Sequence, residues 1–387
     1  MPGSILVARI LGIDIRIHLS WFLIFGLILF LLSNPDQGLF AMMRPTWSDE
    51  RILLVAAVAA LLFFACVLAH ELSHALVARA FRMPVSSITL FLLGGVANLA
   101  KEPPSARAEF LMAISGPAMS LAIGVASLGI AELVNANLGA FYLLDPVGLI
   151  AQYLGVINLA LAVFNMIPGF PLDGGRVLRS VVWAIRRDRA SATRIAARGG
   201  QVVAGLLFLV GITRSFVDRD AFSGVWMALI AYFLYTAASS SLEQEKIAST
   251  VAGVRVSEVM TTAFRAVPPG VRLAELVDQH VLPFNARSVA VVGGDSRLRG
   301  LVSIGDLRKV AQRDWETTPV EAVMTPAREL PEVSPSSRLM TAIERFAGSE
   351  LPAMPVVEDG RLVGMLEREA VLTHVRMREM LGLDGRR

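Results

Sequence analysis

The feature that most constrains the fold is an uninterrupted apolar run over residues 52–69. A helix needs about 20 mainly apolar residues to cross the hydrocarbon core of a bilayer. Extended to residue 79, the run therefore predicts a membrane-spanning helix. Similar segments recur, so the sequence predicts a polytopic α-helical membrane domain with about six transmembrane helices, at 19–33, 52–79, 110–134, 147–167, 200–216 and 222–240.

The apolar segments stop near residue 241, whereas charged side chains are spread through 242–387. We therefore predict a membrane-embedded domain at 1–241, a linker at 242–253 and soluble domains beyond it. The single cysteine, Cys66, cannot form a disulfide within the chain, which fits a reducing compartment for the soluble part. The net charge of +3 is too small to indicate nucleic acid, and we expect no such partner.

The distribution of positive residues predicts the orientation in the lipid bilayer. The segments 79–107 and 172–198 are rich in arginine and lysine, whereas 135–146 contains neither. Loops rich in these residues favour the cytosolic side of a membrane. The pattern predicts a multi-pass cell membrane protein with both termini and the soluble domains in the cytosol.

Two stretches in the apolar half have strand-like patterns. Residues 13–20 alternate apolar and polar side chains, and residues 85–97 are rich in β-forming types and contain the turn signal Gly94-Gly95. Unpaired backbone groups are costly in lipid, so strands at membrane depth must be shielded by protein or line a wet cavity. We expect a small membrane-associated β-sheet next to a polar site.

The second predicted span contains the sequence HELSH at residues 70–74. Histidines four positions apart lie on one helix face, so His70 and His74 can bind one metal ion. Glu71 can then take a proton from a water molecule that the metal activates. Ionisable side chains roughly 13 Å from the helix end marked by Arg79 are costly in a membrane and indicate a functional site. The alternative is a polar helix face that only pairs with neighbouring helices.

A third ligand is needed, and the best candidate is Asp173 in the sequence NMIPGFPLDGGR over residues 165–176. Pro168, Gly169 and Pro171 end the fourth span and let the chain turn into a cavity. Asp173 then lies at about the depth of the two histidines. The alternative is an ordinary helix terminus with a capping aspartate.

Together the two motifs resemble the site-2 protease family of intramembrane metalloproteases, and the resemblance covers most of the membrane-embedded domain. It implies one Zn²⁺ ion per chain, bound by His70, His74 and Asp173. It implies that Glu71 is the general base. It also implies that Asn165 helps to orient substrate or stabilises the developing oxyanion.

The same resemblance gives the 85–97 segment the task of holding an extended substrate strand. We expect Gly94, Gly95 and Asn98 to contact that strand, and a purely turn-forming Asn98 is the alternative. Proteins of this family cleave transmembrane or membrane-proximal segments of other membrane proteins. The usual purpose is release of a cytosolic regulator, such as a transcription factor or an anti-sigma factor fragment. The Gly116-Pro117 pair in the third span is interpreted as a close helix contact.

The soluble part contains an internal repeat, best seen at a spacing of 64 residues. Each unit, at 254–316 and at 317–380, reads strand–helix–strand–strand–helix, and a tail at 381–387 follows. A unit of this size is too small to bury a good core alone, so two units are expected to pair. The pattern is similar to an α/β tandem of CBS domains.

Such tandems commonly bind adenine nucleotides between the repeats, and the ribose-contacting positions of the family match Ser303 and Asp306. The second repeat has Glu367 and Ala370 at the equivalent positions, which predicts that one nucleotide site is degraded. A structural or dimerising pair without a ligand, which would give a homodimer, is the alternative.

The combined expectation is an intramembrane zinc endopeptidase that the cytosolic CBS pair modulates. One rival is a CBS-gated membrane channel or transporter. It would carry ion-pathway charges and internal membrane repeats, and no such repeat is found in 1–241. A second rival is a catalytically silent relative that binds membrane clients on the same scaffold. The intact Glu71 argues against that reading.

Overall fold

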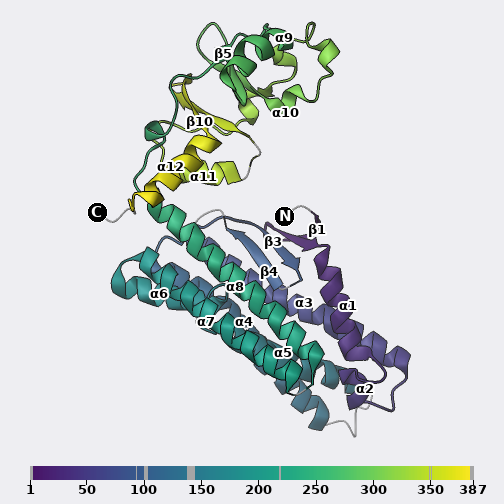
Figure 1. Ribbon diagram of the computed structural model, residues 1–387. Coiled ribbons are helices and arrows are strands. Elements are labelled where there is room, and N and C mark those ends of the chain that lie inside the picture. Colours follow the sequence, from purple (N-terminus) through teal and green to yellow (C-terminus); the bar gives the residue numbers. More distant parts are fainter. Residues whose placement is uncertain are drawn as a thin grey trace. The chain divides into compact units, whose positions relative to one another are not determined.

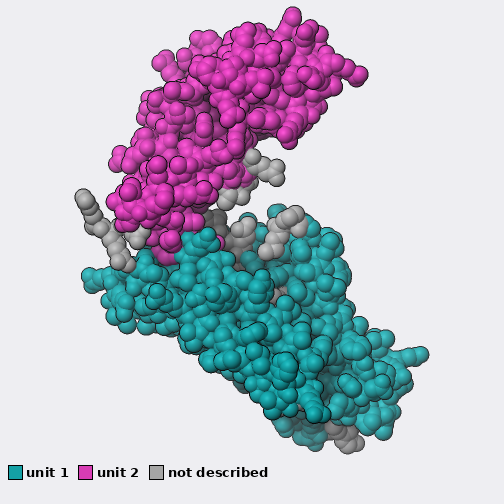
Figure 2. Space-filling model, viewed as in Figure 1, with its two compact units in different colours: residues 1–243 teal, residues 244–387 magenta. Residues whose placement is uncertain are grey.

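The computed structural model describes residues 3–92, 94–99, 103–136, 144–217, 219–347, 349 and 351–383. The chain divides into two compact units, Met1–Glu243 and Gln244–Arg387 (Figure 2). Helix α8 (Ala221–Thr250) carries the chain from the first unit into the second. Each unit has its own architecture.

Within the described part of the chain, five helices are long and apolar enough to cross a membrane. They correspond to five of the predicted spans: α3 (Asp49–Ala80), α4 (Ala106–Ala136), α5 (Asp145–Asn165), α7 (Arg189–Phe216) and α8. The first predicted span corresponds to α1 (Ser20–Ser33), whose 14 residues extend only about 21 Å. That is shorter than the roughly 30 Å hydrocarbon core, so α1 does not reach the length of a full span. The polytopic helical fold is confirmed, with about six spans as an approximate number.

Helix α3 shows how the sequence sets a long helix. Ser48 caps its start by accepting a hydrogen bond from the Arg51 amide, and acidic residues follow in the first turn. Arg79 lies in the last turn, where a cation is favoured by the helix dipole. Its guanidinium donates to the carbonyls of Leu11, Gly12 and Val85. The end of α3 is thereby fixed to the neighbouring strands.

Those strands form one four-stranded sheet in the order β1-β2-β3-β4. They are β1 (Ser4–Ile10), β2 (Ile13–His18), β3 (Val85–Phe91) and β4 (Gly94–Leu99). β2 pairs parallel with β3, and both outer pairs are antiparallel. Ile13 and Ile15 are buried in a core with Ala75 and Ala78 of α3, as the alternation in 13–20 predicts. The sheet is confirmed, although β1 was not predicted.

Helix α4 packs along α3, α5 and α6 (Asp173–Arg186), and it therefore lies centrally in the first unit (Figure 1). Close approach of α4 to α5 depends on Gly155, where a Cβ atom would come within 2.6 Å of the Leu128 side chain. The short helix α2 (Leu39–Met43) ends at Arg44, which makes a bidentate ion pair with Asp145 in the first turn of α5. This pair ties α2 to α5.

The second unit contains two sheets, one of four strands in the order β5-β6-β7-β8 and one of two, β9 and β10. Its strands are β5 (Ala266–Val267), β6 (Ser288–Val292), β7 (Leu298–Ser303), β8 (Thr325–Pro326), β9 (Ala353–Glu358) and β10 (Arg361–Glu367). Its helices are α9 (Leu273–Glu275), α10 (Ile304–Leu307), α11 (Leu339–Ala347) and α12 (Arg368–Met380). Single turns of 3-10 or π helix lie at Val256–Glu258, Leu276–Val281, Leu282–Phe284, Gln312–Asp314, Val320–Ala322 and Ala327–Glu329.

The two repeats exchange strand segments reciprocally. Thr325, at the start of the second repeat, pairs with Leu301 in β7 of the first repeat. Thr261, at the start of the first repeat, pairs with Met365 in β10 of the second repeat. The two pairs are related by the repeat spacing of 64 residues. Each repeat therefore completes the sheet of the other, as expected for units too small to fold alone.

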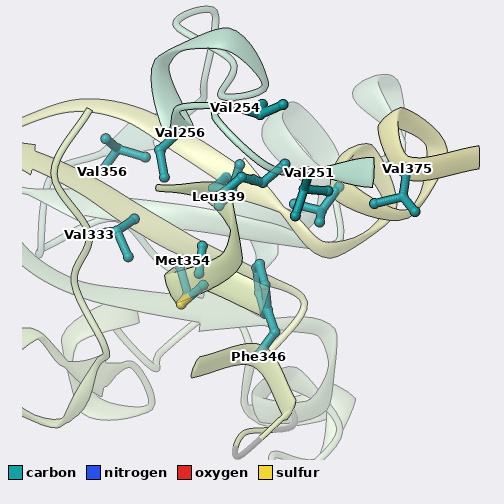
Figure 3. Close-up of a cluster of buried hydrophobic side chains, with 12 residues drawn as sticks. Val251, Val254, Val256, Val333, Leu339, Phe346, Met354, Val356 and Val375 are labelled. Carbon is teal, nitrogen blue, oxygen red and sulfur yellow. The ribbon is translucent and has the colours of Figure 1, made fainter. Parts of the chain in front are cut away.

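A cluster of buried side chains forms the core of the second repeat (Figure 3). Leu339 and Met354 are fully buried in it, together with Val256 from the first repeat. Val251, which directly follows α8, is also buried there. The predicted linker is thus helical as far as Thr250 and then enters the core of the second unit.

Replacing Leu339 by alanine removes a fully buried side chain from this core and leaves a cavity. We expect the free energy of unfolding of the second unit to fall by about 2–5 kcal/mol. Leu372→Ala is the matched control, because Leu372 on α12 is 50% exposed and its loss should change stability by less than about 0.5 kcal/mol. The measurement is the unfolding midpoint of the full-length protein, and equal shifts in both variants would contradict this core.

Candidate metal centre

The two histidines of α3 face one point. The Nε2 atoms of His70 and His74 lie 3.2 Å apart, and the His70 side chain is almost completely buried. Their spacing of four residues places them on consecutive turns of one helix face. The helical geometry thus gives two nitrogen atoms at a separation that one metal ion can bridge.

Asp173 brings a third atom to the same point. It is the first residue of α6, and its Oδ2 lies 3.1 Å from His70 Nε2 and 3.2 Å from His74 Nε2. The glycines after it are required by the local fold. A Cβ atom at Gly174 would collide with the backbone of Met166, and one at Gly175 would collide with the backbone of Gly169. The sequence Asp-Gly-Gly therefore lets the loop after α5 fold back against the first turn of α6.

Helix α4 contacts both imidazole rings at Nδ1, the ring nitrogen that does not face Asp173. His74 Nδ1 donates to the Met112 carbonyl at 2.6 Å, and His70 Nδ1 lies 2.9 Å from Ser120 Oγ. A proton on His74 Nδ1 leaves the lone pair of Nε2 free for a metal ion. Gly116 lies between these contacts, and a Cβ atom there would come closer than van der Waals contact to Nε2 of both histidines.

These features fit a bound zinc ion. His70, His74 and Asp173 are a group whose ligand atoms all lie within 4.8 Å of one another. Two imidazole nitrogens and one carboxylate oxygen are a donor set that zinc accepts, with a coordination position left for chemistry. The space that Gly116 preserves lies against the Nε2 atoms of both histidines, and Asp173 Oδ2 lies within 3.2 Å of the same two nitrogens.

Glu71 lies beside this group, and β4 passes directly against it. A Cβ atom at Gly95 would overlap the Glu71 side chain, so only glycine permits this approach. Gly94, the preceding residue, has a φ of +133°, a backbone conformation that also favours glycine. Both glycines line the same cavity as Glu71. Asn98 lies on β4, but its side chain is outside the described part of the chain.

A cavity of about 490 Å³ joins these parts. The polar residues that line it are the three candidate ligands and, in addition, Glu71, Asn165 and Arg176. Its apolar walls come from α1, α3, α5 and α8, and they include Ile24, Phe63, Leu161, Trp226 and Phe233. The predicted catalytic, metal-binding and glycine positions are therefore brought together in one largely apolar cavity.

Asn165 occupies the last turn of α5 at the edge of this cavity. Its Nδ2 donates one hydrogen bond to the Leu161 carbonyl at 3.1 Å. An amide nitrogen carries two hydrogens, so the second N–H is available to another acceptor. This geometry is compatible with the predicted contact to a developing oxyanion.

The contribution of α4 was not predicted from the sequence. Met112 acts through a backbone carbonyl, which has no signature in the sequence. The close helix contact predicted at Gly116 is present, and the residues of α3 that Gly116 approaches are the two histidines. The spacing of Met112, Gly116 and Ser120 at i, i+4 and i+8 is the signal that could have identified this face.

Comparison with known proteins places the chain in a family. The model of peptidase family M50 matches residues 58–142 and 145–210, and that of the CBS domain matches 256–313 and 320–376. The protein sll0528 of Synechocystis sp., named provisionally as a zinc metalloprotease, is 33% identical over 96% of this chain and 95% of its own. The chain belongs to peptidase family M50. The expected site-2 protease family with a tandem of CBS domains is confirmed.

Other relatives of this M50 protein have similar names. Rip3 of Mycobacterium tuberculosis, also named provisionally as a zinc metalloprotease, is 33% identical over 94% of this chain and 90% of its own. Among solved structures, the site-2 protease from Methanocaldococcus jannaschii is 27% identical. That match covers 62% of this chain and 95% of the solved chain, with a TM-score of 0.43.

The CBS pair of this M50 protein places its candidate nucleotide residues in a helix cap. Asp306 Oδ2 accepts hydrogen bonds from the Ser303 amide and hydroxyl, and Oδ1 accepts one from Lys309 at 2.8 Å. Burial by itself would raise the pKa of the Asp306 carboxyl, but the hydrogen bonds from Lys309 and Ser303 outweigh burial and lower that pKa. The carboxylate therefore stays ionised, and its partner Lys309 is exposed.

A separate cavity of about 400 Å³ lies elsewhere in the pair. Glu367, at the position predicted to be degraded, lines it together with Arg265 and Arg368. The Arg265 guanidinium stacks on the Phe284 ring at 3.6 Å. This cavity is thus bordered by both basic and aromatic side chains.

Gly116→Ala should abolish stoichiometric zinc binding, because the added methyl group would fill the space where the ligand atoms converge. Gly129→Ala on the same helix is the matched control, since a Cβ atom there meets nothing within 4 Å. At an exposed helix position, alanine is also more favourable than glycine by about 1 kcal/mol, so the control should fold at least as well as the parent. Metal content per chain, measured by mass spectrometry on purified protein, tests this, and full zinc in Gly116→Ala would contradict the site.

Proposed function

We propose that this M50 protein is an intramembrane zinc endopeptidase in which His70, His74 and Asp173 bind zinc and Glu71 is the general base. One observation carries the proposal: three ligand atoms converge beside a free carboxylate inside an apolar cavity of a membrane domain. Ionisable groups gathered in such a place are costly unless they serve a function. The names of the relatives from Synechocystis and M. tuberculosis agree with zinc and with proteolysis.

The residues of the cavity suit hydrolysis of a peptide bond. Zinc, when bound, supplies a Lewis acid that polarises the scissile carbonyl and activates water. Glu71 lies beside the ligand group, where it can accept the proton of the attacking water and pass it to the leaving amine. The remaining N–H of Asn165 can donate to the oxygen that gains negative charge. The apolar walls limit the access of bulk water.

The substrate class follows from β4. β4 is an outer strand of its sheet, and its residues Gly94 and Gly95 line the cavity beside Glu71. A transmembrane helix must unwind before its backbone can reach the ligand group, and a strand edge can capture the extended segment through backbone hydrogen bonds. We therefore propose transmembrane or membrane-proximal segments of membrane proteins as substrates. The products would include a cytosolic regulator, such as a transcription factor or an anti-sigma factor fragment.

The positive loops favour a cytosolic location for both termini and the CBS pair, and we propose that this pair modulates proteolysis from that side. Its proposed ligand is an adenine nucleotide contacted by Ser303 and Asp306, and its proposed assembly is a homodimer. The ionised Asp306 carboxylate, whose Lys309 partner is exposed, supports a ribose contact.

Glu71→Gln tests the catalytic proposal. The amide cannot accept a proton, whereas the three ligand atoms are unchanged, so we expect normal zinc content and a loss of cleavage of at least about 10²-fold. The assay is cleavage of a reconstituted transmembrane substrate by detergent-purified protein, beside His70→Ala and Asp173→Ala, which should lose both zinc and activity.

The same experiment separates the rivals. A parent protein that binds one zinc but never cleaves would favour the silent, client-binding relative. A parent that binds no zinc would favour the channel or transporter. Zinc retained in Asp173→Ala would remove Asp173 from the ligand set but keep the protease.

Asp306→Asn tests the nucleotide proposal. The asparagine amide oxygen can still accept the hydrogen bond from the Ser303 amide but lacks the charge, so the affinity of the full-length protein for AMP, ADP or ATP should fall by about tenfold or more. Asp295→Asn, in an exposed turn, is the control and should bind as the parent does. Isothermal titration calorimetry gives the affinities, and no binding by the parent would favour a purely structural pair.

A further inference from the structure

A buried ion pair joins α4 to α6 away from the candidate ligands. Arg179 of α6 donates to Glu109 Oε1 of α4 through both Nε, at 2.5 Å, and Nη2. Glu109 is completely buried, and the Arg179 side chain is nearly so. The Arg179 guanidinium also covers the Phe170 ring, with 5.0 Å to its centroid. The pair therefore holds α4, α6 and the loop before α6 together.

Glu109 belongs to the α4 face that supports the histidines. Met112 follows it by one turn, and Gly116 and Ser120 follow at intervals of four residues. Residues at these spacings lie on one side of a helix. Met112 and Ser120 orient His74 and His70, so the only candidate ligand without a direct partner on this face is Asp173. Asp173 is the first residue of α6, and the ion pair of Glu109 with Arg179 connects this face of α4 to α6.

The position of Asp173 depends on how α6 is placed. Its carboxylate contacts the two imidazoles, and no other side chain among the described residues makes a hydrogen bond or an ion pair to it. Arg179 lies six residues later, about 9 Å along the helix. Phe170, under the same guanidinium, lies three residues before Asp173 and is buried. Arg179 thus restrains the chain on both sides of Asp173.

The desolvation of the Glu109–Arg179 pair also favours a positioning role over a stabilising one. Glu109 Oε2 is buried without a hydrogen-bond partner among the described residues. A buried ion pair with such a defect is a poor source of stability, because desolvation offsets most of the attraction. Pairs of this kind are better suited to fixing the register of two elements.

We propose that Glu109 and Arg179 are positioning residues that set Asp173 against the two histidines, so that α4 locates all three ligands. The inference rests on the proposed zinc site. It predicts that breaking the pair weakens the metal site more than it weakens the fold. Partners that orient metal ligands typically change metal affinity by about 10–100-fold when they are removed.

The test compares Glu109→Gln and Arg179→Gln with the parent in full-length, detergent-purified protein. Zinc affinity is measured by competition with a chelator, and the ligand geometry by the visible spectrum of the cobalt(II)-substituted protein. We expect about 10–100-fold weaker zinc binding and an altered cobalt spectrum in both variants. Arg179→Lys keeps the charge and should restore part of the affinity.

The Arg44–Asp145 pair provides a matched control. It is also a partly or fully buried arginine–carboxylate pair between two helices, but it lies at the start of α5 and not on the face that supports the histidines. Asp145→Asn should lower the unfolding temperature and leave zinc affinity and the cobalt spectrum unchanged. If Arg179→Gln does not fold, Glu109→Gln and Arg179→Lys give the same comparison with a smaller perturbation.

The inference would be overturned if Glu109→Gln or Arg179→Gln had the same zinc affinity and cobalt spectrum as the parent protein. It would also be overturned if Asp145→Asn lost as much zinc affinity as these variants. Both results leave the zinc site itself intact. A parent protein without zinc, or with zinc that His70→Ala does not remove, would instead overturn the proposed function. The two failures are therefore distinguishable.

Discussion

The hydrogen bonds that hold the Nδ1 atoms of His70 and His74 against α4 are the interactions on which the candidate site depends. An imidazole can turn about its side-chain bonds and can carry its proton on either nitrogen. The Met112 carbonyl removes both freedoms for His74, because it accepts only from a protonated Nδ1. In an apolar interior such a bond is stronger than it would be in water. The arrangement of ligand atoms is therefore prepared by the protein before any metal arrives.

The apolar surroundings explain much of the remaining architecture. Burial of an unpaired charge costs several kcal/mol, and the buried carboxylates of Glu109 and Asp145 are each paired with an arginine. Backbone groups meet the same constraint, so the strands near the site are gathered into one sheet. Glycine occupies the positions where these elements must touch. Gly95 lets β4 approach Glu71, and Gly116 lets α4 approach the histidines.

Much of this structure could be predicted from the sequence, because strong local patterns encode it. The apolar runs located the long helices, and the four-residue spacing of His70 and His74 placed both on one face. The break after Asn165 indicated that Asp173 could return to them. The contribution of α4 was not predicted, since a backbone carbonyl and a glycine carry no chemical signature of their own, and only the four-residue spacing of Met112, Gly116 and Ser120 marks this face. The pairing of Glu109 with Arg179 joins residues 70 positions apart and depends on helix packing. The bounds predicted for the first span, 19–33, agree with those of α1 to within one residue, but a helix of this length is too short to cross the hydrocarbon core.

The reciprocal pairing of Thr261 with Met365 and of Thr325 with Leu301 has a consequence for truncation of the chain. A single repeat placed alone would expose the strand edge that its sister normally covers, and an exposed edge promotes aggregation. A cut between the two repeats would therefore leave an incomplete sheet on each side of it. The two repeats thus form one folding unit, and neither can be separated from the other as an independent domain.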